Sequence, residues 1–196
     1  MRRSKISFGM WAIVFVAVGL AGPVAWGSLY HLTPNPSDLS DLDHTKYYKW
    51  GINTPWSFLE DEVTATLTLK GIRNWDSGAN VLFIHLLNYA PLGVTSGNDY
   101  EGGGDYFAGN GVLLVQYNNL PTYPQDLVYT FTSAQLNSLL SYASDGRFAL
   151  GFDPDCHFYN DGISLDISDK PNTPEPATVG LLLAGAFGLA RKRVRV

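Results

Sequence analysis

The chain has 196 residues, 45% of them hydrophobic, which suits one domain of ordinary size with short appendages. Seven of the 13 basic residues lie in the first five or last six positions, whereas all 18 acidic residues lie between Asp38 and Glu175. The middle therefore carries six basic against 18 acidic residues, a net charge of −12, which argues against nucleic acid as a partner. The lone cysteine, Cys156, excludes an intramolecular disulfide and a zinc–thiolate cluster.

Residues 1–27 have the three parts of a secretory signal peptide. A basic start is followed by an apolar stretch from about residue 8 to residue 20, and Ala25 and Gly27 supply a small-x-small cleavage signal. We therefore expect export by the secretion machinery and cleavage by signal peptidase. The alternative is a permanent N-terminal anchor, although the apolar run is shorter than the ~20 residues of a stable span.

The next segments predict mainly β-strands. Residues 28–45 have little periodicity and two prolines, which predicts an extended arm or a long loop before ordered structure near Tyr47. Residues 62–70 alternate strictly between apolar and polar, as in a half-buried strand. Further β-type runs follow at 81–88, 111–117 and 126–131. The first is apolar on both faces except for His85 and Asn88, which suits a central strand covered on both sides or a strand with one protein-covered edge.

One helix and two strands complete the predicted domain. Thr132 and Gln135 have the spacing of a capping box, three leucines form an i, i+3, i+4 stripe, and a glycine follows, which predicts a helix over 133–144. Alternating strands are predicted at 147–153 and 162–168, joined as a hairpin by a polar loop. The fold class is therefore all-β: an antiparallel, jelly-roll-like β-sandwich over 28–170, flanked by the N-terminal signal helix and a C-terminal apolar helix.

The polar loop of that hairpin is a candidate metal site. Asp153, Asp155, His157, Asn160 and Asp161 place four oxygen-bearing side chains and one imidazole within nine residues, and Ca²⁺ prefers oxygen ligands. The aspartates are the proposed ligands of a structural Ca²⁺, although the spacing is not that of an EF-hand. The alternative is ordinary turn chemistry, in which these side chains bond to their own backbone.

The glycine-rich composition of residues 97–111 predicts a surface loop. Its acidic residues, Asp99, Glu101 and Asp105, do not match the spacing of calcium-binding repeats. If the segment does contact a ligand, its aromatic residues Tyr100, Tyr106 and Phe107 are the expected contacts. Trp75, in a turn-like stretch, is a further candidate, although aromatic residues in β-proteins usually belong to the core.

Recognisable catalytic motifs are missing from the sequence. It contains no G-x-S-x-G, H-E-x-x-H or C-x-x-C pattern, and the spacing of its four histidines indicates neither a metal site nor a triad. A glycosidase carboxylate pair is defined by its separation in space, so the sequence leaves that possibility open.

The C-terminal 26 residues, 171–196, have three parts in a fixed order. Pro174, Glu175 and Pro176 end a proline-rich link, residues 177–190 are uncharged, and Arg191, Lys192 and Arg193 follow. As a helix, the uncharged stretch would cover roughly 21 Å, less than the ~30 Å hydrocarbon core. The basic groups at both ends place the acidic domain outside the cytosol.

This tail resembles the PEP-CTERM sorting signal of Gram-negative bacteria. The resemblance implies recognition of Pro174, Glu175 and Pro176 by an exosortase-type membrane protease, transient anchoring in the inner membrane, and release to the cell surface or extracellular matrix. The middle, which includes the D-P-D-C-H loop, looks like exported domains that carry such tails; this likeness transfers no activity.

We therefore expect a non-catalytic surface or matrix protein that acts in adhesion or binds extracellular polysaccharide. The alternatives are a secreted polysaccharide hydrolase with a carboxylate pair and a purely structural matrix protein.

Overall fold

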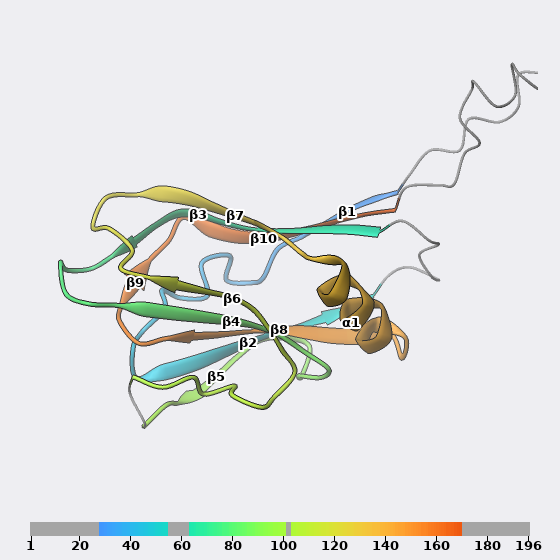
Figure 1. Ribbon diagram of the computed structural model, residues 1–196, viewed down its shortest axis with the longest axis horizontal. Helices are drawn as coiled ribbons and strands as arrows, with labels where there is room; N and C mark the ends of the chain where they lie inside the picture. The colour runs from blue at the N-terminus through green and yellow to red at the C-terminus, as the bar shows by residue number, and fades with distance from the viewer. Residues whose placement is uncertain (1–27, 55–62, 101–102, 170–196) are drawn as a thin grey trace, which may run out of the picture.

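The computed structural model describes residues 28–54, 63–100 and 103–169. Within them, two antiparallel β-sheets pack face to face, and one short helix covers an end of the sandwich (Figure 1). This arrangement confirms the predicted all-β sandwich.

Each sheet draws its strands from distant parts of the chain. The first has the order β1 (Leu29–Leu32), β10 (Gly162–Asp169), β3 (Val63–Asn74), β7 (Gln125–Thr130), and the short β9 (Phe158–Tyr159) pairs with the end of β3. The second has the order β5 (Gly93–Asn98), β2 (Lys46–Asn53), β8 (Arg147–Pro154), β4 (Val81–Leu87), β6 (Val112–Asn118).

The pairing is that of a jelly roll. Eight strands form four nested antiparallel pairs, β1 with β10, β2 with β8, β3 with β7 and β4 with β6, while β5 and β9 are additions. The predicted hairpin of the last two strands is wrong, because β8 and β10 belong to different sheets. An alternating strand buries its apolar face equally well in either sheet of a sandwich, so the sequence pattern does not distinguish a hairpin from a crossing.

The main core lies between the sheets. Strand β3 contributes alternate residues from Val63 to Leu69, and β8 contributes Phe148, Leu150 and Phe152. The helix α1 (Ser133–Ala143) begins at the predicted capping box, in which Thr132 and Gln135 bond reciprocally, and ends one residue before the predicted end.

The segment before β2 is part of the folded domain, whereas the sequence predicted an extended arm or a long loop. Leu29–Leu32 pairs with β10, and the side chains of Leu39 and Leu42 are fully buried in the core. Leu42 also forms a backbone bridge with Phe158 of β9. The sequence pattern missed this segment because burial at two single positions produces no periodicity.

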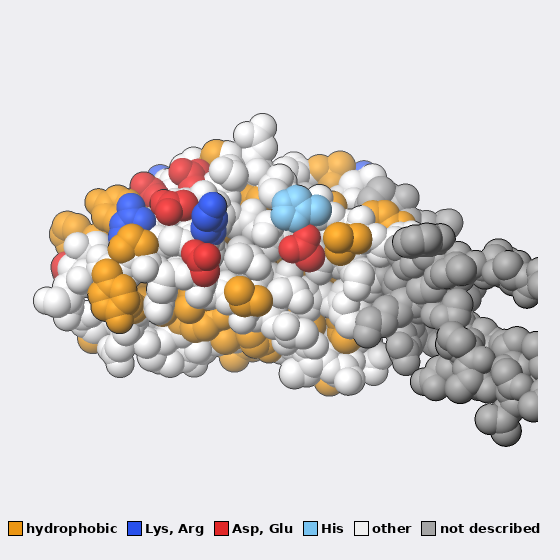
Figure 2. Space-filling view, turned by 90° about the horizontal axis from the view of Figure 1, so that it is seen from above, with side chains coloured by type: hydrophobic (Ala, Val, Ile, Leu, Met, Phe, Trp, Pro, Cys, Tyr) orange, Lys and Arg blue, Asp and Glu red, His pale blue; other side chains and the backbone are white. Residues whose placement is uncertain are grey.

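The outer faces of the two sheets differ. Uncharged polar side chains and backbone dominate the outer face of the β1-β10-β3-β7 sheet. Most of its charged side chains gather towards one end, and one acidic side chain lies beside a histidine nearer the middle (Figure 2). The outer face of the second sheet instead carries a second apolar cluster, formed by Leu87, Ala90, Phe107 and Ala149 with Tyr47 packed against it. Phe107 belongs to the β5–β6 connection, so this connection folds over the sheet.

The predicted processing segments lie outside the described residues. They are residues 1–27 with Ala25 and Gly27, and residues 171–196 with Pro174, Glu175, Pro176, Arg191, Lys192 and Arg193. Among the described residues, no helix combines the length and apolar character that a membrane crossing requires.

Candidate functional site

Strand β8 brings an aspartate beneath the β5–β6 connection. Because side chains alternate along a strand, Phe152 faces the core and Asp153 faces the outer surface of the sheet. The carboxylate of Asp153 is nevertheless fully buried, and its Oδ2 accepts a hydrogen bond of 2.8 Å from the backbone N–H of Tyr106 in the connection. The fold therefore places a carboxylate in an interior that the chain itself closes.

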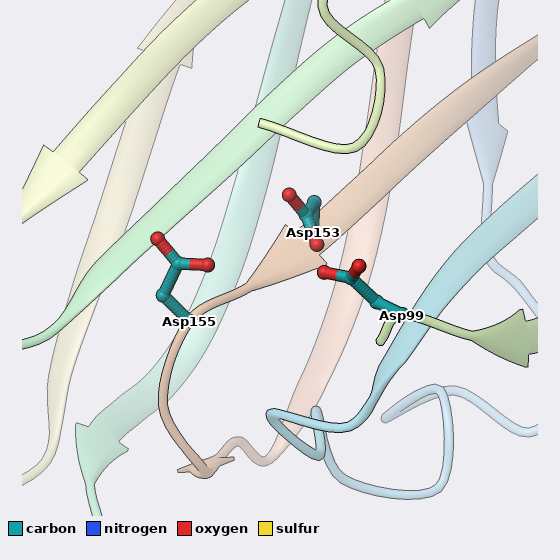
Figure 3. Close-up of side chains that lie close together, drawn as sticks. All are labelled: Asp99, Asp153 and Asp155. Atoms are coloured by element: carbon teal, nitrogen blue, oxygen red, sulfur yellow. The ribbon is translucent and has the colours of Figure 1, made fainter. Parts of the chain in front are cut away.

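Three carboxylates meet at this point. Asp99, which follows β5, Asp153 of β8 and Asp155 just beyond β8 each offer an oxygen atom, and these atoms lie within 4.8 Å of one another (Figure 3). Asp155 also accepts a hydrogen bond of 3.0 Å at Oδ1 from the N–H of Gly103. Asp153 and Asp155 are thus both bonded to the connection that covers them.

The cluster disfavours the charged form of its central member. The pKa of Asp153 is raised to about 7, chiefly by burial. The hydrogen bond from the Tyr106 N–H lowers this pKa, whereas the charges of Asp99, Asp155 and Asp105 raise it. The pKa of Asp155 is also raised, again chiefly by burial. In addition, Asp153 Oδ1 is buried and has no hydrogen-bond partner.

The predicted ligand set is therefore only partly assembled. Asp153 and Asp155 lie in the cluster, but Asp161 is exposed, with its Oδ1 3.5 Å from Nη1 of Arg73, and Asp99 takes the third position. Asn160 instead accepts a hydrogen bond from the N–H of Gly162 in its own turn and donates one to the carbonyl oxygen of Asp38, in the segment before β2. The polar loop crosses between sheets, which carries its second half away from the cluster.

No local pattern in the sequence marks Asp99 as a member of the cluster. It comes just after β5, a six-residue strand that was not predicted, and reaches Asp153 because β5 and β8 both pair with β2. Three adjacent strands of one sheet therefore bring together residues 54 positions apart in the chain.

A histidine and a phenylalanine attach the connection to the sheet. His85 of β4 is buried, with its Nε2 2.9 Å from Asp105 Oδ2, and Asp105 Oδ1 accepts from the N–H of Phe107. Phe107 is buried against the sheet, and it is also one of the residues that line the adjacent groove. A Cβ at Gly151 would lie 2.9 Å from the Phe107 ring, which explains why β8 has no side chain there.

An open groove lies beside this anchored connection. It has a volume of about 480 Å³. Most of its lining residues are polar or aromatic, namely Lys49, Asn88, Tyr89, Tyr106, Phe107 and Asn110, and Leu87 and Gly111 complete the lining. The Tyr106 ring stacks on Tyr47, with 3.8 Å between ring centroids. A hydrogen bond with Tyr47 raises the pKa of Tyr106 to about 12, so its hydroxyl remains protonated at neutral pH.

Of the four expected ligand contacts, the three other than Phe107 are exposed, but they occupy different positions. Tyr106, 39% exposed, lines the groove, whereas Tyr100, 88% exposed, receives a hydrogen bond of 2.6 Å from Asn98 Nδ2. Trp75, 58% exposed, lies in the β3–β4 turn, with its ring centroid 6.4 Å from that of His157. Of the three, only Tyr106 contributes to the groove.

Comparisons with known proteins leave the family open. No family model matches the chain, and no curated protein does. Among solved structures, it is similar to a recombinantly expressed latent aurone synthase, a polyphenol oxidase, at 11% identity and a TM-score of 0.41 over 67% of this chain and 26% of that one. A latent apple tyrosinase gives 10% identity and a TM-score of 0.42 over 66% and 27%. The chain thus spans about a quarter of each of these proteins.

Proposed function

We propose that this chain is an exported, exosortase-sorted protein of the cell surface or extracellular matrix that binds polysaccharide without cleaving it. The observation that carries the proposal is the groove beside the β5–β6 connection, with two partly exposed tyrosines, two asparagines and a lysine around it. Aromatic faces pack against the apolar faces of sugar rings, and amide groups donate to and accept from hydroxyls.

The groove suits a chain of neutral sugars. It is partly open to solvent, and Tyr89, one of its lining residues, is 60% exposed. The protonated Tyr106 hydroxyl supplies a further polar contact, and Lys49 extends over the Tyr47 ring, 5.0 Å from its centroid. The acidic middle of the chain would repel a polyanion, which favours an uncharged polysaccharide.

The burial of Asp153 supports a non-catalytic role. A glycosidase acid or base must reach the glycosidic oxygen or the attacking water. Asp153, whose raised pKa would suit a general acid, is fully buried beneath the connection and bonded to Tyr106. A sugar in the groove would not contact it in this arrangement.

The first and last described strands lie side by side, which is compatible with sorting through the C-terminal tail. Leu29 of β1 pairs with Ser168 of β10, at the opposite end of the domain from the C-terminus of β8, where the acidic cluster lies (Figure 1). The tail itself rests on the sequence resemblance.

Binding can be tested with the host's own exopolysaccharide. The full-length chain should sediment with the polymer and release no new reducing ends. Tyr89→Ala should weaken retention, because it removes an exposed aromatic face of the groove. Tyr123→Ala is the matched control, since Tyr123 is similarly exposed (66%) but lines a different hollow, near Asp76 and Asn80.

The retention and reducing-end measurements distinguish binding, hydrolysis and a structural role. New reducing ends that depend on the protein would overturn the non-catalytic proposal in favour of the hydrolase. Absence of retention, or equal loss in both tyrosine variants, would overturn binding at the groove and leave a structural matrix role.

Sorting can be tested independently in the native host. Glu175→Ala should leave the C-terminal segment attached and the protein in the inner-membrane fraction, as mass spectrometry of the intact chain would show. Normal cleavage of this variant would contradict recognition of the Pro174–Pro176 element.

A further inference from the structure

The acidic cluster contains a buried oxygen atom that lacks a partner. Asp153 is fully buried, and its Oδ1 has no hydrogen-bond partner, whereas its Oδ2 is bonded to the Tyr106 N–H. A buried carboxylate oxygen left in this state costs free energy, so native proteins usually satisfy it with a hydrogen bond or a metal. In Figure 3 the side chain of Asp153 lies between those of Asp99 and Asp155.

The separations within the cluster match one bound cation. Two oxygens that coordinate the same Ca²⁺ at 2.3–2.6 Å can be separated by at most about 4.6–5.2 Å. The oxygens of Asp99, Asp153 and Asp155 lie within 4.8 Å of one another. Three carboxylates offer up to six oxygen atoms, and Ca²⁺ accepts water at any remaining positions.

The charge balance also favours a cation. Ion pairs among the described residues include neither Asp153 nor Asp155, and the nearby Asp105 is paired with His85 instead. Buried carboxylates are normally paired with a cation or bound to a metal. We propose that Asp99, Asp153 and Asp155 together bind one Ca²⁺ ion.

The ion would hold the β5–β6 connection on the sheet. Asp99 begins this connection, and the two other ligands accept hydrogen bonds from its backbone, at Gly103 and Tyr106. Binding of Ca²⁺ favours the ionised carboxylates and so strengthens both of these bonds. Ca²⁺ therefore fixes Tyr106 at the edge of the groove. The ion site itself does not depend on polysaccharide binding.

Calcium titration of the full-length chain tests the site. After treatment with a chelator, isothermal titration with CaCl₂ should show one ion per chain, and thermal unfolding should shift to higher temperature in Ca²⁺ than in chelator. Both effects should disappear in Asp99→Asn and in Asp155→Asn. They should persist in Asp161→Asn, which alters an exposed carboxylate of the same type outside the cluster.

Two results would overturn the proposal. The first is a parent protein that shows neither binding heat nor a thermal shift with Ca²⁺. The second is a calcium response that survives in both cluster variants, or that Asp161→Asn removes. If a cluster variant does not fold, Tb³⁺ luminescence excited through the tyrosines of the parent protein, and displaced by Ca²⁺, provides the deciding measurement.

Discussion

Replacing Asp153 by asparagine should stabilise the metal-free protein at neutral pH. Asparagine is nearly isosteric with aspartate. Its side-chain carbonyl oxygen can accept the hydrogen bond from the Tyr106 N–H, and its NH₂ group can donate to the carboxylate of Asp99. The substitution thus removes a buried negative charge while keeping the known hydrogen bond. In a protein with Ca²⁺ bound, the same substitution should be destabilising because a ligand is lost.

The pKa shift gives the magnitude. The carboxylate has a pKa of about 7 in the folded chain and an ordinary value of 3.8, so the shift is about three units. At ~1.4 kcal/mol per unit, ionising Asp153 in the fold costs up to ~4 kcal/mol above pH 7. We expect Asp153→Asn to recover ~2–4 kcal/mol, or roughly 10 °C in melting temperature for a domain of this size.

The sign of the pH dependence follows from linkage. Because its folded-state pKa is raised, Asp153 binds more protons in the folded protein than in the unfolded chain between about pH 4 and pH 7. Its contribution to the stability of the parent protein in chelator should therefore be most favourable below pH 4, decrease up to pH 7 and then level off. Asp155, whose pKa is also raised, adds to this loss, and Asp99 and Asp105 face the same carboxylate.

Urea unfolding in chelator at pH 5 and pH 8 measures the effect. The free energy of unfolding of the parent should fall between these values by more than that of Asp153→Asn. If the variant is less stable than the parent at pH 8 in chelator, or if the two have the same pH dependence, the ionised Asp153 carboxylate does not destabilise the fold.

Three further substitutions test the packing that supports the site. Phe107→Ala should lower the free energy of unfolding in urea by about 3 kcal/mol and weaken calcium binding, because the β5–β6 connection loses its apolar contact with the sheet. Unchanged stability would contradict this role of Phe107. Gly151→Ala should cost ~1–3 kcal/mol, since its Cβ would press on that ring, whereas Gly104→Ala, with open space around it, should be nearly neutral. Thr132→Ala should cost about 1 kcal/mol, because the helix loses its N-cap. Gln135→Ala should lower the melting temperature more, because the glutamine side chain also donates to two backbone carbonyls of β6. Equal effects of the two substitutions would show that the bonds to β6 add no stability.

Local patterns in the sequence predicted most elements of the domain. Strict alternation over 62–70 marked β3, and the capping box at Thr132 marked α1, because both depend on neighbours within a few residues. The jelly-roll class followed from many short strands with glycine-rich turns. β5 was missed because Gly93–Asn98 has two glycines and no alternation of apolar residues.

The candidate site was only half predictable. Asp153 and Asp155 are close in the chain, so a dense run of oxygen ligands identified both. The third carboxylate of the cluster depends on which strands are adjacent, and the sequence suggested Asp161, which instead pairs with Arg73. Clustering along the chain is a guide to clustering in space only where the chain does not cross between sheets.

The all-β class, the strand and helix patterns and two of the three carboxylates could be inferred from the sequence, because these depend on side-chain period and local turn chemistry. The sequence also predicts export and sorting through the two terminal segments. Three features could be seen only in the folded chain: β8 and β10 belong to different sheets, the glycine-rich connection packs on a sheet face, and Asp99 joins the cluster. Each of these depends on contacts between residues distant in the chain, where the balance of burial and hydrogen bonding is set by the whole fold.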